Sequence, residues 1–234
     1  MTAQEIYERL HALGEPQQAQ VLQRYFKTGP GEYGEGDVFA GIRVPVLRKL
    51  AKEYEALSLS ETIRLLQSPL HEARLLALIM SVRAYTRGDA AIQERIYREY
   101  LRNTLFINNW DLVDVSAEHI VGAHLKNGGR ERLRTLAESD LLWERRIAVM
   151  ATFHFIRQGE FDDTLRIAEL LLRDPEDLIH KAVGWMLREI GNRDQSVEES
   201  FLSARYKTMP RTMLRYAIEK FPEGLRRQYL HGAL

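Results

Sequence analysis

SPLHEARLLA at positions 68–77 and SDLLWERRIA at positions 139–148 are two versions of one pattern. Each leads into a long apolar helix, and each carries an arginine, Arg74 or Arg145, in its second half. Later restarts at Asp174-Pro175 and Met209-Pro210 place helix starts near positions 140, 175 and 210, roughly 35 residues apart. A period of this length is typical of arrays of helix pairs.

The rest of the chain also shows helical spacing. Apolar residues recur at helical intervals before and after Pro16, which predicts a helical hairpin at the start of the chain: Ile6, Leu10, Leu13, then Val21, Leu22, Tyr25 and Phe26. No stretch alternates with the period of a strand. We therefore predict an all-α fold, a right-handed solenoid of HEAT-like antiparallel helix pairs that forms one domain over residues 1–234.

A glycine-rich stretch, TGPGEYGEGDVFAG at positions 28–41, interrupts the helices. So much glycine disfavours a stable helix and predicts the longest loop of the chain. Phosphate cradling is one use of such loops, but the spacing matches neither nucleotide fingerprint and no strand precedes it. A surface loop is the favoured interpretation. A new helix follows from Val44-Pro45, and Ser58 is expected to cap the next one.

Composition excludes several classes of protein. The chain has no cysteine, which removes disulfides, thiolate nucleophiles, zinc–thiolate sites and iron–sulfur clusters. It has no apolar run long enough for a bilayer and no basic-then-apolar leader, so we expect a soluble cytoplasmic protein. Its 33 basic and 33 acidic residues balance, so a polyanion could be bound only if charge is segregated.

Basic residues do recur at similar points of successive repeats: Arg48, Lys49 and Lys52, then Arg74, Arg145, Arg146, Lys181, Arg188, Arg211 and Arg215. Between positions 205 and 227 the sequence contains seven basic residues and only two acidic ones. A solvated basic surface is the usual fate of such residues. The repetition favours a basic concave face that follows a phosphate backbone.

The polar stretch Asn108-Asn109-Trp110-Asp111 is expected to open a helix, because its side chains can bind the free amides of the first turn. Asp114 comes four residues after Trp110, so both lie on one helix face. A capping acid beside a core tryptophan is the plainer interpretation. Trp143 is expected in the core. Gly184, before Trp185, would weaken a helix interior unless something has to approach closely there.

Several segments together resemble the AlkD-like DNA alkylation repair family of HEAT-type DNA glycosylases. They are RY at 24–25, FAGIRVP at 39–45, WDLVD at 110–114, WERR at 143–146 and KAVGWMLRE at 181–189. The resemblance covers nearly the whole chain in matching order. The long glycine-rich stretch before Phe39 departs from it.

This resemblance implies a bacterial enzyme of the cytosol or nucleoid that removes cationic N3- or N7-alkylated purines from duplex DNA as a monomer, without metal or cofactor. It implies that Asp114 is the catalytic carboxylate, that Trp110 and Trp185 form an aromatic cleft, and that Tyr25 and Arg146 support the DNA contact. With the basic residues of the repeats, the predicted DNA-contact set is Tyr25, Arg43, Arg48, Arg74, Arg145, Arg146, Lys181, Arg188, Arg211 and Arg215.

Three alternatives come from other classes of protein. A HEAT-like protein-interaction scaffold would show the same core pattern, but it gives no reason for two tryptophans and an aspartate to converge. A relative that binds DNA structures without catalysis is expected to lack those residues. A metalloenzyme is disfavoured because His119 and His124 are five residues apart and the other histidines are scattered, which favours structural or surface roles for them.

Overall fold

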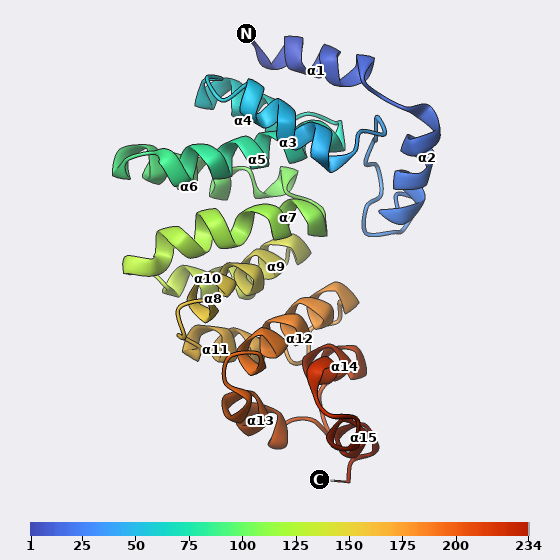
Figure 1. The fold of residues 1–234 in the computed structure, drawn as a ribbon, viewed down its shortest axis with the longest axis vertical. Coiled ribbons are helices and arrows are strands. Elements are labelled where there is room, and N and C mark those ends of the chain that lie inside the picture. Colours follow the sequence, from blue (N-terminus) through green and yellow to red (C-terminus); the bar gives the residue numbers. More distant parts are fainter. Residues whose placement is uncertain (234) are drawn as a thin grey trace. The chain divides into compact units, whose positions relative to one another are not determined.

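The fold is seen in a computed structural model that describes residues 1–233, and the regular structure in them is helical (Figure 1). Val38 and Leu70 form an isolated parallel bridge, and no strand occurs in the described range. The predicted all-α fold is confirmed. The helices group into two compact units, one ending at Ile120 and the other beginning at Val121.

The first unit is built around one buried helix, α5. Its helices are α1 (Ala3–Ala12), α2 (Pro16–Tyr25), α3 (Val44–Glu53), α4 (Leu59–Leu66), α5 (His71–Arg87), α6 (Ala90–Arg102) and α7 (Trp110–Ala117), with a 3-10 turn at Thr104–Phe106. Helix α5 packs against α3, α4, α6 and α7, and every residue from His71 to Ser81 is buried. A helix covered on all sides needs no polar face, which explains the unbroken apolar run after Arg74.

Local signals explain where these helices begin. Thr2 and Glu5 form a capping box at α1, with the Thr2 hydroxyl accepting from the Glu5 amide at 3.3 Å. Pro16 opens α2, as its fixed φ angle favours. The predicted cap at Ser58 is confirmed, because its hydroxyl accepts from the Glu61 amide at 3.3 Å.

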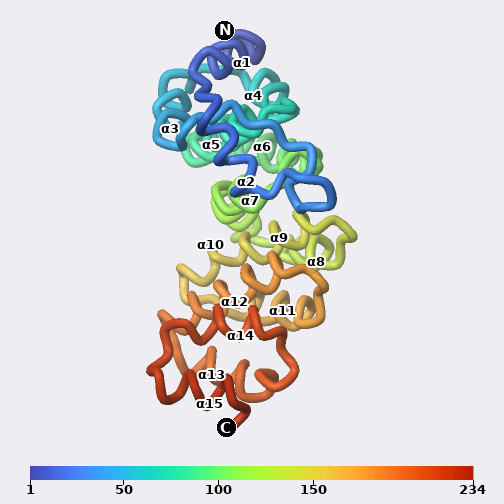
Figure 2. Tube along the Cα trace, turned by 90° about the vertical axis from the view of Figure 1, so that its right-hand side faces the viewer, coloured from blue at the N-terminus to red at the C-terminus, as the bar shows by residue number. Residues whose placement is uncertain are grey.

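The glycine-rich stretch at 28–41 contains no helix or strand, so the predicted loop is confirmed. Its far end is fastened to α5 by the buried Glu72, whose carboxylate accepts from the amides of Ala40, Gly41 and Ile42 at 3.0, 2.8 and 3.1 Å. Figure 2 shows this part of the chain, in blue between α2 and α3, passing beside α7. The loop is therefore a folded part of the first unit.

The second unit contains shorter helices joined by tight turns. They are α8 (Glu131–Ala137), α9 (Leu142–Ala151), α10 (Phe153–Ile156), α11 (Asp162–Leu170), α12 (Asp177–Gly191), α13 (Gln195–Ser203), α14 (Arg211–Ala217) and α15 (Glu223–His231), with 3-10 turns at Leu125–Asn127 and Ile218–Lys220. A π-helical turn, Glu118–Gly122, leads into this unit from α7. Helices α9, α12 and α14 begin 35 and 34 residues apart, as the restarts predicted.

Gly184 explains how closely two of these helices pack. A Cβ atom at this position would lie 2.4 Å from the carbonyl oxygen of Met213 and 2.6 Å from the Cβ of Tyr216. A close approach of this kind is the condition under which a glycine suits this helix interior, and α14 is the helix that approaches. Trp143 differs from its prediction, because it lies in the first turn of α9 and is only half-buried. No helix within residues 1–233 is both long enough and apolar enough to cross a bilayer.

Candidate functional site

The start of α7 is fastened to the glycine-rich loop by two asparagines. The Asn109 side-chain oxygen accepts from the amide of Trp110 at 2.9 Å, which caps the helix as predicted. The side-chain amides of Asn108 and Asn109 both donate to Asp37 at 3.3 Å. Asn109 is fully buried. The residues that open α7 therefore have their position set by one carboxylate of the loop.

Asp37 is the centre of a buried polar network. Its carboxylate accepts from Arg74 Nη2 at 2.5 Å and lies 3.1 Å from His71 Nδ1. Burial alone would raise the pKa of Asp37, but the hydrogen bond to His71 and the charge of Arg74 outweigh it and hold the pKa below its usual value. Asp37 is therefore an anion inside the fold.

His71 joins this network to the first turn of α7. Its Nε2 atom lies 2.9 Å from Asp111 Oδ2, so both ring nitrogens face carboxylates. An ionised carboxylate only accepts hydrogen bonds, so both nitrogens can be satisfied only by the imidazolium form. Burial lowers the pKa of His71, but the bonds to Asp111 and Asp37 outweigh it and raise that pKa above its ordinary value. His71 is a satisfied structural histidine, as the sequence interpretation proposed.

Four rings form a continuous stack beside this network. Trp110 lies against Phe26 with centroids 5.2 Å apart, Phe26 against Phe39 at 5.0 Å, and Phe39 against His71 at 4.4 Å. The three pairs are within 22° of parallel. Phe26, Phe39 and His71 are buried, whereas Trp110 is half-buried. The stack thus ends in an indole that reaches the surface.

Tyr25 completes the aromatic surface at this end of the stack. It is 63% exposed, and its ring meets that of Trp110 edge to face with centroids 6.0 Å apart. Asp114 follows Trp110 by one helical turn on the same face of α7 and is half-buried. Burial, and then the charge of Asp114, raise the pKa of the Tyr100 phenol in the neighbouring α6. A carboxylate and two accessible rings therefore share one region of the first unit.

Trp185 supplies an aromatic surface in the second unit. The indole is half-buried on α12, donates from Nε1 to Glu189 at 3.3 Å, and lies 6.4 Å from the ring of Phe153. Arg193 holds the same glutamate at 3.0 Å. The indole is therefore oriented by its own helix and partly open to solvent.

Arg74 and Arg145, the arginines of the two matching sequence segments, have matching surroundings. Arg74 Nη1 donates to the carbonyl oxygens of residues 68 and 69 at 3.0 and 3.1 Å. Arg145 Nη1 donates to those of residues 139 and 140, both at 3.0 Å. Each arginine thus closes the turn that precedes its own helix.

Each of these two arginines also pairs with a buried aspartate. Arg74 pairs with Asp37, and Arg145 Nε lies 2.6 Å from Asp174, whose side chain is 3% exposed. The side chains of Arg74 and Arg145 are themselves 5% and 12% exposed. Both arginines therefore bind groups of the protein itself.

Four of the eight other predicted DNA contacts also bind protein partners. Arg146 is buried and donates to the carbonyl oxygen of residue 178 at 2.7 Å, and Arg188 pairs with residue 219. Lys181 pairs with residue 177 at 2.8 Å but is 40% exposed, and Arg211 donates to the carbonyl of residue 230 at 2.9 Å. Tyr25, Arg43, Arg48 and Arg215 are exposed, and the three arginines among them have no ion-pair partner in the described part of the chain.

Sequence reasoning did not single out the residues that support Trp110, namely Asp37, Phe26, Phe39, His71 and Asp111. Phe39 lay in a segment quoted for the family resemblance, and Asp111 was interpreted as a capping acid. Their contacts join positions 34 and 40 residues apart, which no helical periodicity reveals. Among residues 1–233, no three histidine, aspartate or glutamate side chains are placed to hold a metal ion.

Comparisons with known proteins agree with this picture. A family model described as DNA alkylation repair enzyme matches residues 6–221. A solved structure, described as a predicted DNA alkylation repair enzyme from Enterococcus faecalis, superposes with a TM-score of 0.69 at 18% identity, covering 90% of this chain and 97% of that one. At this identity the likeness concerns the fold. No curated protein matches the sequence.

Proposed function

Because the chain belongs to the DNA alkylation repair enzyme family, we propose that it is a DNA glycosylase. Its proposed substrates are N3- and N7-alkylated purines in duplex DNA, and its reaction is hydrolysis of the bond between the purine and the deoxyribose. The observation that carries this proposal is the arrangement on α7: a half-buried Trp110 supported by Phe26, and Asp114 one turn farther along.

The chemistry of the substrate suits such a site. Alkylation at N3 or N7 gives the purine a positive charge, so the base is already a good leaving group and needs little acid catalysis. Its departure leaves an oxocarbenium-like sugar, as in other glycoside cleavages. A carboxylate stabilises that developing cation and orients the attacking water, and an aromatic face attracts the cationic base.

We assign these two roles to Asp114 and Trp110. Trp110 would present its indole face to the damaged nucleotide, and the exposed Tyr25 beside it would contact the adjoining backbone. The stacked rings of Phe26 and Phe39 support the inner face of the indole and so keep Trp110 at the surface. Trp185 is proposed as an aromatic DNA contact of the second unit.

The phosphate contacts are assigned to the predicted basic residues that remain accessible. Arg43, Arg48 and Arg215 are exposed and can bind phosphates without leaving a buried partner, and Lys181 can exchange its surface pair with Asp177 for a phosphate. The buried Arg74 and Arg146, and Arg145 with a side chain that is 12% exposed, would act indirectly by holding helix starts in place. Substitutions in the two groups of residues should therefore have different effects in experiments.

Base release is the decisive test. The full chain is incubated with duplex DNA that contains N7-methylguanine, without metal or nucleotide, and free base is measured against the spontaneous rate. We expect release well above that rate, with the abasic strand left intact. Tight binding of the duplex with release at the spontaneous rate would instead show a DNA-binding protein without glycosylase activity and would overturn the proposal.

A further inference from the structure

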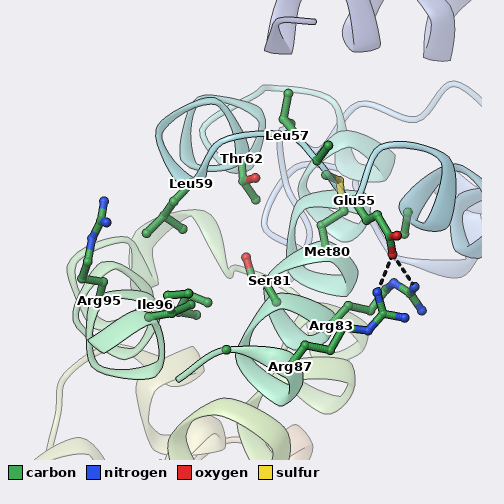
Figure 3. A pocket seen from close by; sticks show the side chains of 15 residues that line it. Glu55, Leu57, Leu59, Thr62, Met80, Ser81, Arg83, Arg87, Arg95 and Ile96 are labelled. Atoms are coloured by element: carbon green, nitrogen blue, oxygen red, sulfur yellow. Dashed lines mark hydrogen bonds and ion pairs between the residues drawn. The ribbon is translucent and has the colours of Figure 1, made fainter. Parts of the chain in front are cut away.

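A cavity of about 490 Å³ lies in the first unit, away from the start of α7. It is enclosed by the end of α3, the turn at 54–58, the start of α4, the second half of α5 and the first half of α6 (Figure 3). The aromatic stack touches α5 at His71, whereas the cavity touches α5 from Met80 to Arg87. A helix rises about 1.5 Å per residue, so the two sites lie at opposite ends of α5.

The interior of this cavity is apolar. Its wall includes Leu57, Leu59, Met80 and Ile96, together with Ile92, which is 43% exposed. The two hydroxyls in the wall are already satisfied by backbone: Thr62 donates to the carbonyl of residue 58 at 3.1 Å, and Ser81 to that of residue 77 at 2.8 Å. The interior therefore favours a hydrocarbon chain over a polar group.

The rim of the cavity is cationic. Arg83 and Arg87 both donate to one carboxylate, that of Glu55, and Arg95 has no ion-pair partner among the described residues. Figure 3 shows Arg95 near Leu59 and Ile96, and the Arg83–Glu55–Arg87 group on the other side of the cavity. The residues that line the cavity therefore carry three positive charges and one negative charge.

We propose that this cavity binds a small amphipathic anion, a saturated monocarboxylate of roughly ten carbons, within the size that small-molecule sites accept. The hydrocarbon chain lies over Leu57, Leu59, Met80 and Ile96, and the carboxylate is held by Arg95, while Arg83 and Arg87 on the other side add to the positive charge of the rim. A neutral chain would leave the excess positive charge unmatched, and a cationic one would be repelled by it. This inference does not depend on the proposed glycosylase activity.

The test measures binding of decanoate to the full chain by titration calorimetry, with decanol and decylamine as probes of equal length. We expect saturable binding of decanoate at one site, weaker binding of decanol and none of decylamine. Equal binding of decanoate and decanol would overturn the anionic part of the proposal. No saturable binding of decanoate would overturn it entirely.

Matched variants locate the site. Arg95→Gln is expected to weaken decanoate binding roughly tenfold, the scale of a lost hydrogen bond to a charged group. Arg98→Gln, a change on the exposed face of the same helix and outside the cavity, should leave binding unchanged. Ala84→Trp, at an exposed position of the wall, should fill the cavity and abolish binding while circular dichroism shows the parental fold. Equal effects of the two arginine changes, or parental affinity in Ala84→Trp, would place binding elsewhere.

Discussion

The rings of Phe26 and Trp110 lie 20° from parallel with their centroids 5.2 Å apart. Phe26 is buried at the end of α2, and Trp110 is half-buried at the start of α7. The indole that we assign to the damaged nucleotide therefore rests on a residue from a distant part of the sequence. Its orientation depends on α2 and on the loop that follows it.

Phe26→Leu should separate this supporting role from general stability. The change keeps an apolar side chain but removes the stack, so we expect the free energy of unfolding to fall by about 1 to 2 kcal/mol. Base release should slow, because the indole loses its fixed position. Phe221→Leu is the control, since Phe221 is equally buried but lies in the second unit. If both variants lose stability and release base equally well, Phe26 does not orient Trp110 for the reaction.

Asp114→Asn addresses the reaction step. The variant keeps the shape of the side chain and removes its charge, so release of N7-methylguanine should fall by about a hundredfold, the scale of one lost electrostatic stabiliser. Binding of the duplex should hold or improve slightly, because a carboxylate near phosphates is repelled by them. Single-turnover release and a binding titration separate the two effects. Asp162→Asn, an exposed first-turn aspartate of α11, serves as the control, and release at the parental rate in Asp114→Asn would make Asp114 a structural residue.

Arg145 and Arg215 should respond to alanine in opposite ways. Arg145→Ala leaves Asp174 buried without its partner, so we expect a loss of about 3 to 5 kcal/mol in the free energy of unfolding. Arg215 is exposed, so Arg215→Ala should keep the parental stability, weaken duplex binding for any sequence and reduce the salt slope by about one. Chemical denaturation and binding at several salt concentrations measure both. Parental affinity and salt slope in Arg215→Ala would remove this residue from the proposed DNA surface.

Glu198 gives the fold a dependence on pH. Burial, and then the neighbouring Glu199, raise the pKa of Glu198 from 4.5 to about 8. The folded chain thus binds this proton more tightly than the unfolded chain, so the stabilisation is complete below pH 4.5 and is lost as the pH rises toward 8. The slope approaches about 1.4 kcal/mol per pH unit for one proton.

Glu198→Gln removes the carboxyl group that titrates. The free energy of unfolding should therefore fall less steeply between pH 4.5 and 8. Above pH 8 the variant should be more stable than the parent, because the parent must bury a carboxylate there. Glu199→Gln on the same helix is the comparison. Unfolding free energies measured across this range check the prediction, and parallel curves for Glu198→Gln and the parent would contradict it.

Much of the architecture could be predicted because its signals are local. The restarts near 140, 175 and 210 mark real helix starts, and Gly184 marks a real helix contact. Trp110 and Asp114 share a helix face because the spacing within one helix is fixed by geometry. These features depend on residues close together in the chain.

The support of the candidate site could not be predicted in the same way. Asp37, His71 and Asp111 meet only after the glycine-rich loop folds against α5 and α7. The arginines show the same limit: Arg74 and Arg215 have the same charge, but one is buried against an aspartate and the other faces solvent. Periodicity places an arginine on a helix, but packing against other segments decides which partner it finds.

The attachment of the glycine-rich loop by Glu72 also determines where the chain can accept extra length. Nothing lies within 4 Å of a Cβ built at Gly31, whereas one at Gly41 would lie 2.2 Å from the Glu15 carbonyl oxygen. An inserted Gly-Ser segment at Gly31 should therefore leave the melting temperature nearly unchanged, since longer surface loops add little closure entropy. The same segment at Gly41 should lower it, because it breaks the register of the three amides on Glu72. The first position is thus a natural place to graft a tag or a reporter peptide close to the aromatic surface without disturbing it.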